Sequence, residues 1–225
     1  MKKKQTPDEY RRNLPHIQPQ GAMFFITFRL YGSIPASEIQ KLSDIYKNTN
    51  TTNISGKPVK SLKQEQQEDY FLSFDKCLDN NHNAPYYLSI TEIAQLVSSS
   101  LHFRDGRDYK LVCFCIMSNH VHLIIYKLEK PLDRIMKELK SFTGKEALKI
   151  LRNTDKEVPT SPNIPTKDPV SFKFWQSESF DRIIRDRNDM ATKISYILNN
   201  PVKAGLVNYW KDWKWSYCQS EFLDI

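Results

Sequence analysis

The 225-residue sequence contains no apolar run approaching the roughly 20 residues that a helix needs to span a bilayer. The first five residues are basic, but the polar segment 6–9 follows them where a secretory signal would have an apolar stretch. We therefore expect neither a membrane partner nor a secretory signal.

Cysteine is also scarce, with four residues that show no regular spacing: Cys77, Cys113, Cys115 and Cys218. Cys113 and Cys115 are two apart on a predicted strand, a separation that suits packing better than a disulfide. Reduced thiols in a cytoplasmic protein are the expectation.

Positive charge and aromatic side chains are abundant. Lys and Arg total 33 against 26 Asp and Glu, a formal net charge of +7, and the chain has 12 Phe, 11 Tyr and 4 Trp. This combination favours an anionic partner, with nucleic acid as the leading candidate. Hydrophobic residues make up 40% of the chain, which is enough for a packed core.

The sequence predicts one domain with loop insertions. Residues 1–20 are polar and basic and contain three prolines, so we expect an irregular arm there. The domain is expected over 21–218, interrupted by a proline-rich loop at 152–171, and 219–225 are expected to form a tail. No internal repeat is present.

Strand-forming apolar patterns predict core strands over 22–30, 109–117 and 120–126. The last two are separated by Ser118 and Asn119 alone, which is the spacing of a β-hairpin.

Helical periodicity predicts helices over 35–47, in pieces over 58–101, over 131–151, and over 189–200. The third of these is expected to bury a stripe of Leu132, Ile135, Leu139 and Phe142. Ser89 is expected to cap the helix that follows it, and Pro201 is expected to end the last helix.

Two histidines, His120 and His122, begin the second strand of the hairpin. Because side chains alternate along a strand, both imidazoles point to one face while Val121 and Leu123 point to the other. Two nitrogen ligands side by side on a rigid strand can form half of a divalent-metal site. A pair of structural or surface histidines is the alternative, and only a second element elsewhere in the chain can decide.

A structural zinc site is a third interpretation of this hairpin. Its ligands would come from the two facing strands: Cys113, Cys115, His120 and His122. Because Cys-x-Cys and His-x-His lack the usual Cys-x-x-Cys spacing, this interpretation ranks last.

The second element is the helix over 189–200. Tyr196 and Asn200 are four residues apart, so their hydroxyl and amide groups share one helix face. Nothing in this spacing alone distinguishes Tyr196 from the other tyrosines of the chain.

Both regions resemble one known family. Residues 117–123 (Met-Ser-Asn-His-Val-His-Leu) resemble the HUH signature of single-tyrosine transposases, two histidines around a bulky apolar residue. Residues 196–207 closely resemble the Tyr-Ile-x-x-Asn-Pro-Val-Lys-x-Gly segment of REP-associated tyrosine transposases. Residues 174–176 and 181–185 resemble the family's stretch before that segment, so the motifs follow the family's order.

The resemblance implies an α+β fold, in which an antiparallel sheet with packed helices has a ferredoxin-like core. The histidine strand would be central, and the tyrosine helix would lie over the histidines. It also implies a DNA transposase or nickase that cleaves and rejoins single-stranded DNA at hairpin-containing sites, through a covalent 5′-phosphotyrosine on Tyr196.

The resemblance further implies a divalent ion, Mg²⁺ or Mn²⁺, held by His120, His122 and Asn200. Asn200 has a second interpretation, because it could instead cap the end of its helix. Tyr126 lies on the histidine face by alternation and is a fallback nucleophile.

DNA contacts are implied or suggested for Lys140, Ser141, Arg182, Arg185 and Lys203. An alternative of a different class is a domesticated DNA-binding protein that keeps the fold but no longer cleaves. The presence of both histidines and of Tyr196 favours the enzyme. Both a monomer and a homodimer are compatible with the resemblance.

Overall fold

A computed structural model describes residues 21–49, 59–81, 84–153 and 173–223. The described residues divide into two compact units, one of residues 34–49 and 59–81 and the other of residues 21–33, 84–153 and 173–223. The predicted arm at 1–20, and the predicted loop at 152–171 from residue 154 onward, lie outside the described residues. The division into arm, domain and tail stays a prediction.

The described part of the first unit consists of α1 (Ala36–Thr49) and α2 (Val59–Asn80), which contact each other. α1 begins directly after Pro35, whose carbonyl accepts hydrogen bonds from the backbone N–H groups of Glu38 (3.0 Å) and Ile39 (3.1 Å). Proline suits a helix start because it has no N–H group to leave unpaired. The predicted start of this helix is therefore confirmed.

A five-stranded antiparallel sheet is the centre of the second unit's described part, in the order β4-β1-β3-β2-β5. Its strands are β1 (Met23–Arg29), β2 (Lys110–Ile116), β3 (His120–Tyr126), β4 (Phe180–Ile184) and β5 (Ser216–Cys218). β2 and β3 form the predicted hairpin, closed by a hydrogen bond from the backbone N–H of Met117 to the carbonyl of His120 (2.9 Å). The α+β class and the central position of the histidine strand are confirmed.

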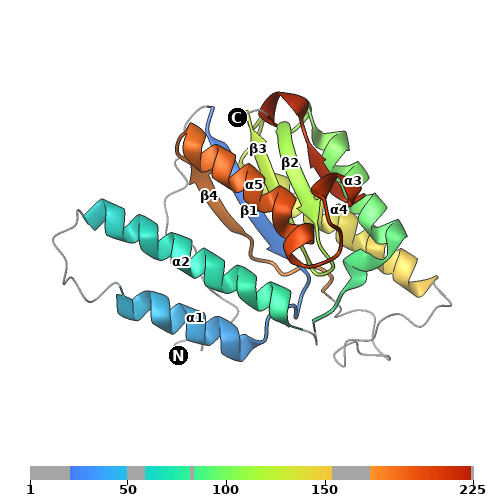
Figure 1. The fold of residues 1–225 in the computed structure, drawn as a ribbon. Helices are drawn as coiled ribbons and strands as arrows, with labels where there is room; N and C mark the ends of the chain where they lie inside the picture. The colour runs from blue at the N-terminus through green and yellow to red at the C-terminus, as the bar shows by residue number, and fades with distance from the viewer. Residues whose placement is uncertain (1–20, 50–58, 82–83, 154–172, 224–225) are drawn as a thin grey trace, which may run out of the picture. The chain divides into compact units, whose positions relative to one another are not determined.

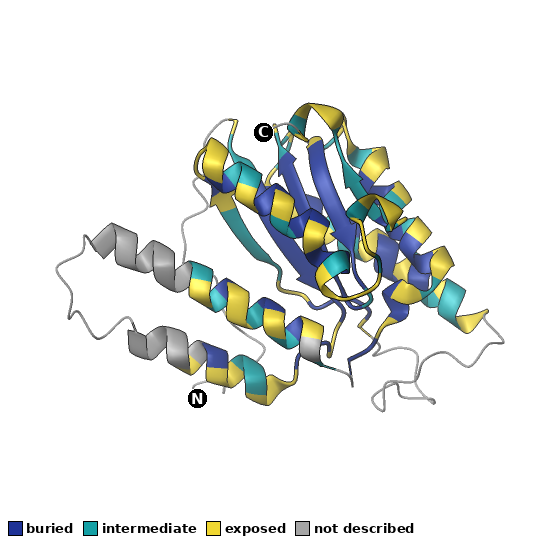
Figure 2. Ribbon diagram, in the orientation of Figure 1, coloured by how far each residue is buried: buried dark blue, intermediate teal, exposed yellow. Residues whose placement is uncertain are grey.

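The two faces of this sheet differ in what covers them. α3 (Thr91–Arg104) and α4 (Leu132–Arg152) pack on one face, whereas α5 (Arg187–Lys203) lies on the other (Figure 1). On the α3–α4 face, alternate strand residues such as Val121 and Leu123 join the main apolar core. The alternate positions, His120 and His122, face α5 instead. The central strands are buried along almost their whole length (Figure 2).

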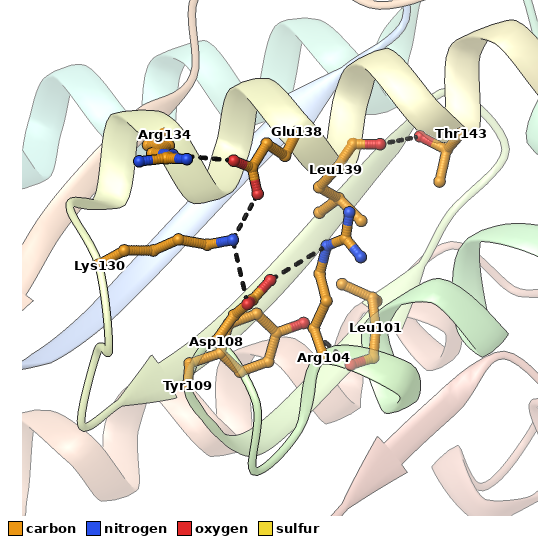
Figure 3. Close-up of polar contacts among 9 residues, drawn as sticks. All are labelled: Leu101, Arg104, Asp108, Tyr109, Lys130, Arg134, Glu138, Leu139 and Thr143. Carbon is orange, nitrogen blue, oxygen red and sulfur yellow. Dashed lines mark hydrogen bonds and ion pairs between the residues drawn. The ribbon is translucent and has the colours of Figure 1, made fainter.

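Ion pairs and hydrogen bonds join α3, α4 and the turn before β2 (Figure 3). Lys130 pairs with Asp108 (Nζ to Oδ1, 3.1 Å) and with Glu138 on α4. The hydroxyl of Tyr109 donates to the carbonyl of Leu101 on α3 (2.9 Å). These contacts stabilise the helix layer that lies opposite the histidines.

One residue of the stripe predicted for α4 is wrong, since Phe142 is 49% exposed. The buried side of the helix continues through Thr143, Gly144 and Ala147 instead. The reason is Trp175, whose Nε1 donates to the hydroxyl of Thr143 (2.9 Å) and whose ring lies 3.3 Å from where a Cβ of residue 144 would be. Small side chains at this point leave room for the indole.

Two predicted helix ends are also wrong. The residue before α3 is Ile90, which makes no side-chain cap, and the hydroxyl of Ser89 donates to the carbonyl of Tyr86. Pro201 lies inside α5, which continues to Lys203. The missing N–H of this proline costs one hydrogen bond close to the helix end, while the helix buries an apolar side on the sheet.

Candidate metal and nucleophile site

His120 and His122 lie side by side at the start of β3 and are fully buried. Their Nε2 atoms are 3.1 Å apart, and the rings meet edge to face with centroids 4.7 Å apart. The alternation predicted from the sequence therefore brings two imidazole nitrogens to one point.

The other nitrogen of each ring has a polar partner. Nδ1 of His120 lies 2.6 Å from Oδ1 of Asn119, and Nδ1 of His122 lies 2.8 Å from the hydroxyl of Thr27. An amide oxygen only accepts, so His120 carries its proton on Nδ1 and keeps a lone pair on Nε2. When the Thr27 hydroxyl accepts as well, His122 adopts the same tautomer.

Burial keeps both imidazoles neutral. It lowers the pKa of His120 to about 3. It also lowers the pKa of His122 well below its ordinary value, and the neighbouring His120, Lys193 and Lys203 lower it further. A neutral imidazole is the form that binds a metal ion.

These two residues fit a metal ion. When both Nε2 atoms carry a lone pair, these lone pairs, 3.1 Å apart, repel each other unless a proton or a cation lies between them. This spacing matches two ligands on one ion with metal–nitrogen bonds of about 2.0–2.1 Å. The pair can therefore supply two nitrogen ligands to a divalent ion.

Asn200, the predicted third ligand, is buried on α5 inside the helix, four residues after Tyr196. The interpretation of Asn200 as a helix cap is wrong, because the cap position is Ala204, whose N–H bonds to the carbonyl of Asn200 (3.0 Å). Its role as a ligand stays a prediction.

The cysteines do not join the histidines. In the part of the chain that the structure describes, no cysteine belongs to a group of three metal-ligand side chains close enough to share an ion. Cys113 lies opposite Cys218 on β5, and the thiol of Cys115 lies 3.6 Å from the sulfur of Met117. The geometry therefore gives no support to the zinc interpretation.

Tyr196 lies against the histidines within the same chain. Its ring meets the ring of His122 edge to face, with centroids 5.6 Å apart, and that of Phe25 at 6.3 Å. Phe25 in turn stacks on His122 at 5.9 Å. Tyr196 and the two histidines thus form one cluster between α5 and the sheet.

Two cations flank the tyrosine ring. Nζ of Lys203 lies 4.8 Å from the ring centroid of Tyr196, and Nζ of Lys193 lies 5.8 Å from it. Lys203 was predicted, whereas sequence reasoning missed Lys193, which is only 2% exposed. Its position one turn before Tyr196 was the available signal, because residues three apart share a helix face.

Arg182 and Arg185 both bind a carboxylate of their own chain. Arg182 pairs with Asp189, and Nε of Arg185 lies 3.1 Å from the second carboxylate oxygen. The same helix end is capped by Asp186, which accepts from the backbone N–H of Asp189 (2.9 Å). These contacts join β4 to the start of the tyrosine helix, while DNA binding by the two arginines stays a prediction.

Replacing Asp189 with asparagine should lower the free energy of unfolding by about 1–3 kcal/mol, because it removes the buried negative charge that Arg182 and Arg185 both contact. Burial raises the pKa of Asp189, but hydrogen bonds and charges from Arg185 and Arg182 outweigh burial, so the pKa is lowered overall. Its stabilising effect is therefore present above the unfolded pKa and is lost as the pH falls through the folded pKa.

Urea unfolding at a series of pH values measures this effect. The difference between wild type and Asp189→Asn should shrink toward strongly acid pH, and Asp212→Asn, at an exposed position, is the control. Equal stability of wild type and Asp189→Asn at neutral pH would contradict the structural role.

Lys140 and Ser141 do not join the site. Both belong to α4, on the opposite face of the sheet, where Nζ of Lys140 donates to the carbonyls of Gln176 (2.9 Å) and Ser177 (3.0 Å) and Ser141 is exposed. Tyr126, the fallback nucleophile, lies four residues beyond His122, a distance of about 13 Å along a strand. It packs against Phe222 instead, with ring centroids 6.0 Å apart.

Thr27 and Asn119 were also missed. Asn119 could have been noticed as the neighbour of His120, but Thr27 is 95 residues from His122 and meets it only through the register of β1 and β3. Thr27→Val should weaken Mn²⁺ binding by roughly 10- to 100-fold, because the partner of a metal-binding histidine orients its ring. Calorimetric titration with Mn²⁺ measures this affinity.

The matched control is Thr143→Val, which removes a buried hydroxyl from the opposite face of the sheet. It should change stability but leave Mn²⁺ affinity unaltered. An equal loss of affinity in both variants would mean that Thr27 acts through general destabilisation.

Comparison with known proteins identifies a sequence relative and a similar solved structure. No family model matches the chain. It is 30% identical over 114 residues to a candidate REP-associated tyrosine transposase of Haemophilus influenzae, over 48% of this chain and 58% of that protein. The chain thus spans little more than half of the relative's length.

A solved structure of a REP-associated tyrosine transposase bound to a REP hairpin is similar over 92% of this chain and 81% of that chain, with 16% identity and a TM-score of 0.48. Among the described residues, no helix has both the length and the apolar character required to cross a membrane.

Proposed function

Since the chain is a distant homologue of the REP-associated tyrosine transposases, we propose that it is a metal-dependent enzyme that cleaves and rejoins single-stranded DNA in the cytoplasm. The observation that supports this most directly is the position of Tyr196, whose ring lies 5.6 Å from that of His122. A nucleophile beside a pair of metal ligands is the arrangement that this reaction requires.

In the proposed reaction, the phenolic oxygen of Tyr196 attacks the phosphorus of a phosphodiester. The new phosphorus–oxygen bond replaces the bond to the 3′ oxygen, which leaves as a hydroxyl after gaining a proton, while the tyrosine loses one. The DNA on the 5′ side ends in a free 3′-hydroxyl, and the 5′ phosphate of the other piece stays on Tyr196. Attack by a 3′-hydroxyl reverses the step and rejoins the strand.

His120 and His122 would hold the divalent ion, with Asn200 as the proposed third ligand. When bound, Mg²⁺ or Mn²⁺ acts as a Lewis acid that stabilises charge developing on the phosphoryl oxygen. Two imidazole ligands suit Mn²⁺ at least as well as Mg²⁺, which prefers oxygen. The residues of the chain exclude water from the pair, which is buried, and fix the orientation of both rings.

The cations near Tyr196 would bind the phosphate. Lys203 is the best placed of the predicted DNA-binding residues, since its ammonium group lies 4.8 Å from the ring centroid of Tyr196. Lys193 joins it on the buried side. Because one chain holds the histidines and the tyrosine together, a monomer is sufficient for one site.

Incubation of the wild-type protein with a hairpin-bearing single-stranded oligonucleotide and Mn²⁺ or Mg²⁺ tests the proposal. We expect a protein–DNA adduct that survives denaturation and is removed by protease. A label at the 3′ end of the DNA should stay with the protein, while a label at the 5′ end should leave with the free product. EDTA should prevent both the formation of the adduct and the release of the 5′-labelled product.

Two outcomes would contradict this proposal. Binding of the oligonucleotide without an adduct in either metal would identify a DNA-binding protein that does not cleave. A 5′ label that stays on the protein would show attachment to the other side of the phosphodiester.

A further inference from the structure

The chain that follows α5 carries exposed aromatic and basic side chains for which the proposed reaction has no use. Tyr209 is 51% exposed, Trp210 beside it is half-buried, and Leu206 is 47% exposed. Two lysines, Lys211 and Lys214, follow and are exposed. We call Tyr209, Trp210 and Lys211 the aromatic platform.

The lysine of this platform lies over both rings. Nζ of Lys211 is 6.0 Å from the ring centroid of Tyr209 and 5.6 Å from that of Trp210, and the two rings are 6.1 Å apart and tilted. Trp210 belongs to the short helix η2 (Trp210–Asp212). Ring faces beside an ammonium group at the surface can bind a flat ligand that carries negative charge.

The platform is connected to the proposed site. η2 contacts α5, and the chain turns back after the helix through Gly205, whose positive φ (69°) suits glycine. Lys203, in the last turn of α5, lies over Tyr196. Three lysines thus lie on the segment that begins at the end of α5 and carries the platform: Lys203, Lys211 and Lys214.

We propose that the aromatic platform binds single-stranded DNA by stacking unpaired bases on Tyr209 and Trp210. Lys203, Lys211 and Lys214 would contact the phosphates between those bases and the phosphodiester at Tyr196. That path of the strand rests on the proposed function. Every base has a π face, so stacking on aromatic rings tolerates any sequence, and cations along the same path bind the backbone.

Charge favours this partner over another protein surface. Between residues 203 and 215 the only acidic residue is Asp212, against three lysines. Exposed rings separated by cations suit an anionic strand better than an apolar helix or a second copy of the same positive surface.

The test is the affinity of the full-length protein for a single-stranded oligothymidylate, measured by fluorescence anisotropy without added metal. Tyr209→Ala and Trp210→Ala should each weaken binding by roughly 5- to 150-fold, the range for loss of one stacked base. Trp210→Phe, which keeps a ring, should bind more tightly than Trp210→Ala.

Phe103→Ala is the matched control. Phe103 is 60% exposed, has the guanidinium of Arg107 4.4 Å from its ring centroid, and belongs to α3 on the other face of the sheet. The same kind of aromatic–cation pair is therefore removed from a helix for which no DNA contact is proposed, and binding should not change.

Unchanged DNA affinity in both platform variants would overturn the inference, and so would an equal loss of affinity in Phe103→Ala. A third contrary result would be platform variants that have half the wild-type mass in solution and unchanged DNA affinity. The last would make this face a contact between copies of the chain. If wild type forms the adduct while the platform variants bind as wild type does, this inference fails and the proposed function stands. If wild type forms no adduct but the platform variants lose oligothymidylate binding, the proposed function fails and this inference stands.

Discussion

Replacing Tyr196 with phenylalanine should abolish the covalent protein–DNA adduct and leave the fold unchanged. The substitution removes only the hydroxyl, while the ring contacts with His122 at 5.6 Å and Phe25 at 6.3 Å can remain. Loss of a nucleophile typically costs roughly 10³-fold or more in rate. Denaturing gels with a 3′-labelled oligonucleotide measure the adduct, and anisotropy should show oligonucleotide affinity within a few fold of wild type.

Tyr126→Phe is the matched control for this prediction. Tyr126 lies on the same strand as the histidines but packs against Phe222, away from them. The Tyr126→Phe variant should form the adduct at the wild-type rate. An adduct in Tyr196→Phe that disappears in Tyr126→Phe would reverse the assignment of the nucleophile.

Replacing His120 and His122 together with alanine should remove binding of Mn²⁺ and reduce adduct formation by roughly 100-fold or more. A bound metal ion contributes several kcal/mol of transition-state stabilisation in reactions of this kind, and the two Nε2 atoms, 3.1 Å apart, are its predicted ligands. Calorimetric titration with Mn²⁺ and the rate of adduct formation measure the two effects. Binding of the single strand should persist, because the cations near Tyr196 remain.

His102→Ala controls for the loss of an imidazole. His102 is on α3 and packs between Phe114 (5.4 Å) and Tyr217 (4.6 Å), on the side of the sheet away from α5. Its substitution should leave Mn²⁺ affinity unaltered. Wild-type adduct formation by the double histidine variant would show that the reaction does not depend on this pair.

Local patterns account for half of the site. Alternation along β3 was sufficient to place both imidazoles on one face and Val121 and Leu123 on the other, since this follows from the geometry of any strand. Likewise the two-residue spacing between β2 and β3 predicted their hairpin. Tyr196 was identified as the nucleophile that accompanies the histidines only because the motif around it resembles that of a known family.

Positions that depend on neighbours distant in sequence were decided by the tertiary structure. The family resemblance implied DNA contacts for Lys140 and Ser141. Packing placed their helix, α4, on the face of the sheet opposite the histidines, and their contact with DNA stays a prediction. Pro201 predicted a helix end, yet burial of α5 on the sheet kept Asn200 helical.

The sequence by itself determined the pairing of the histidines, the hairpin that holds them and, through the motif, their association with Tyr196. Only the tertiary structure decided that Thr27 meets His122, that Lys193 and Lys203 flank the tyrosine, and that Arg182 and Arg185 bind Asp189. The physical reason is that periodicity fixes the side of an element on which a residue lies. What that side faces depends on strand register and helix packing, which are set by contacts between distant residues.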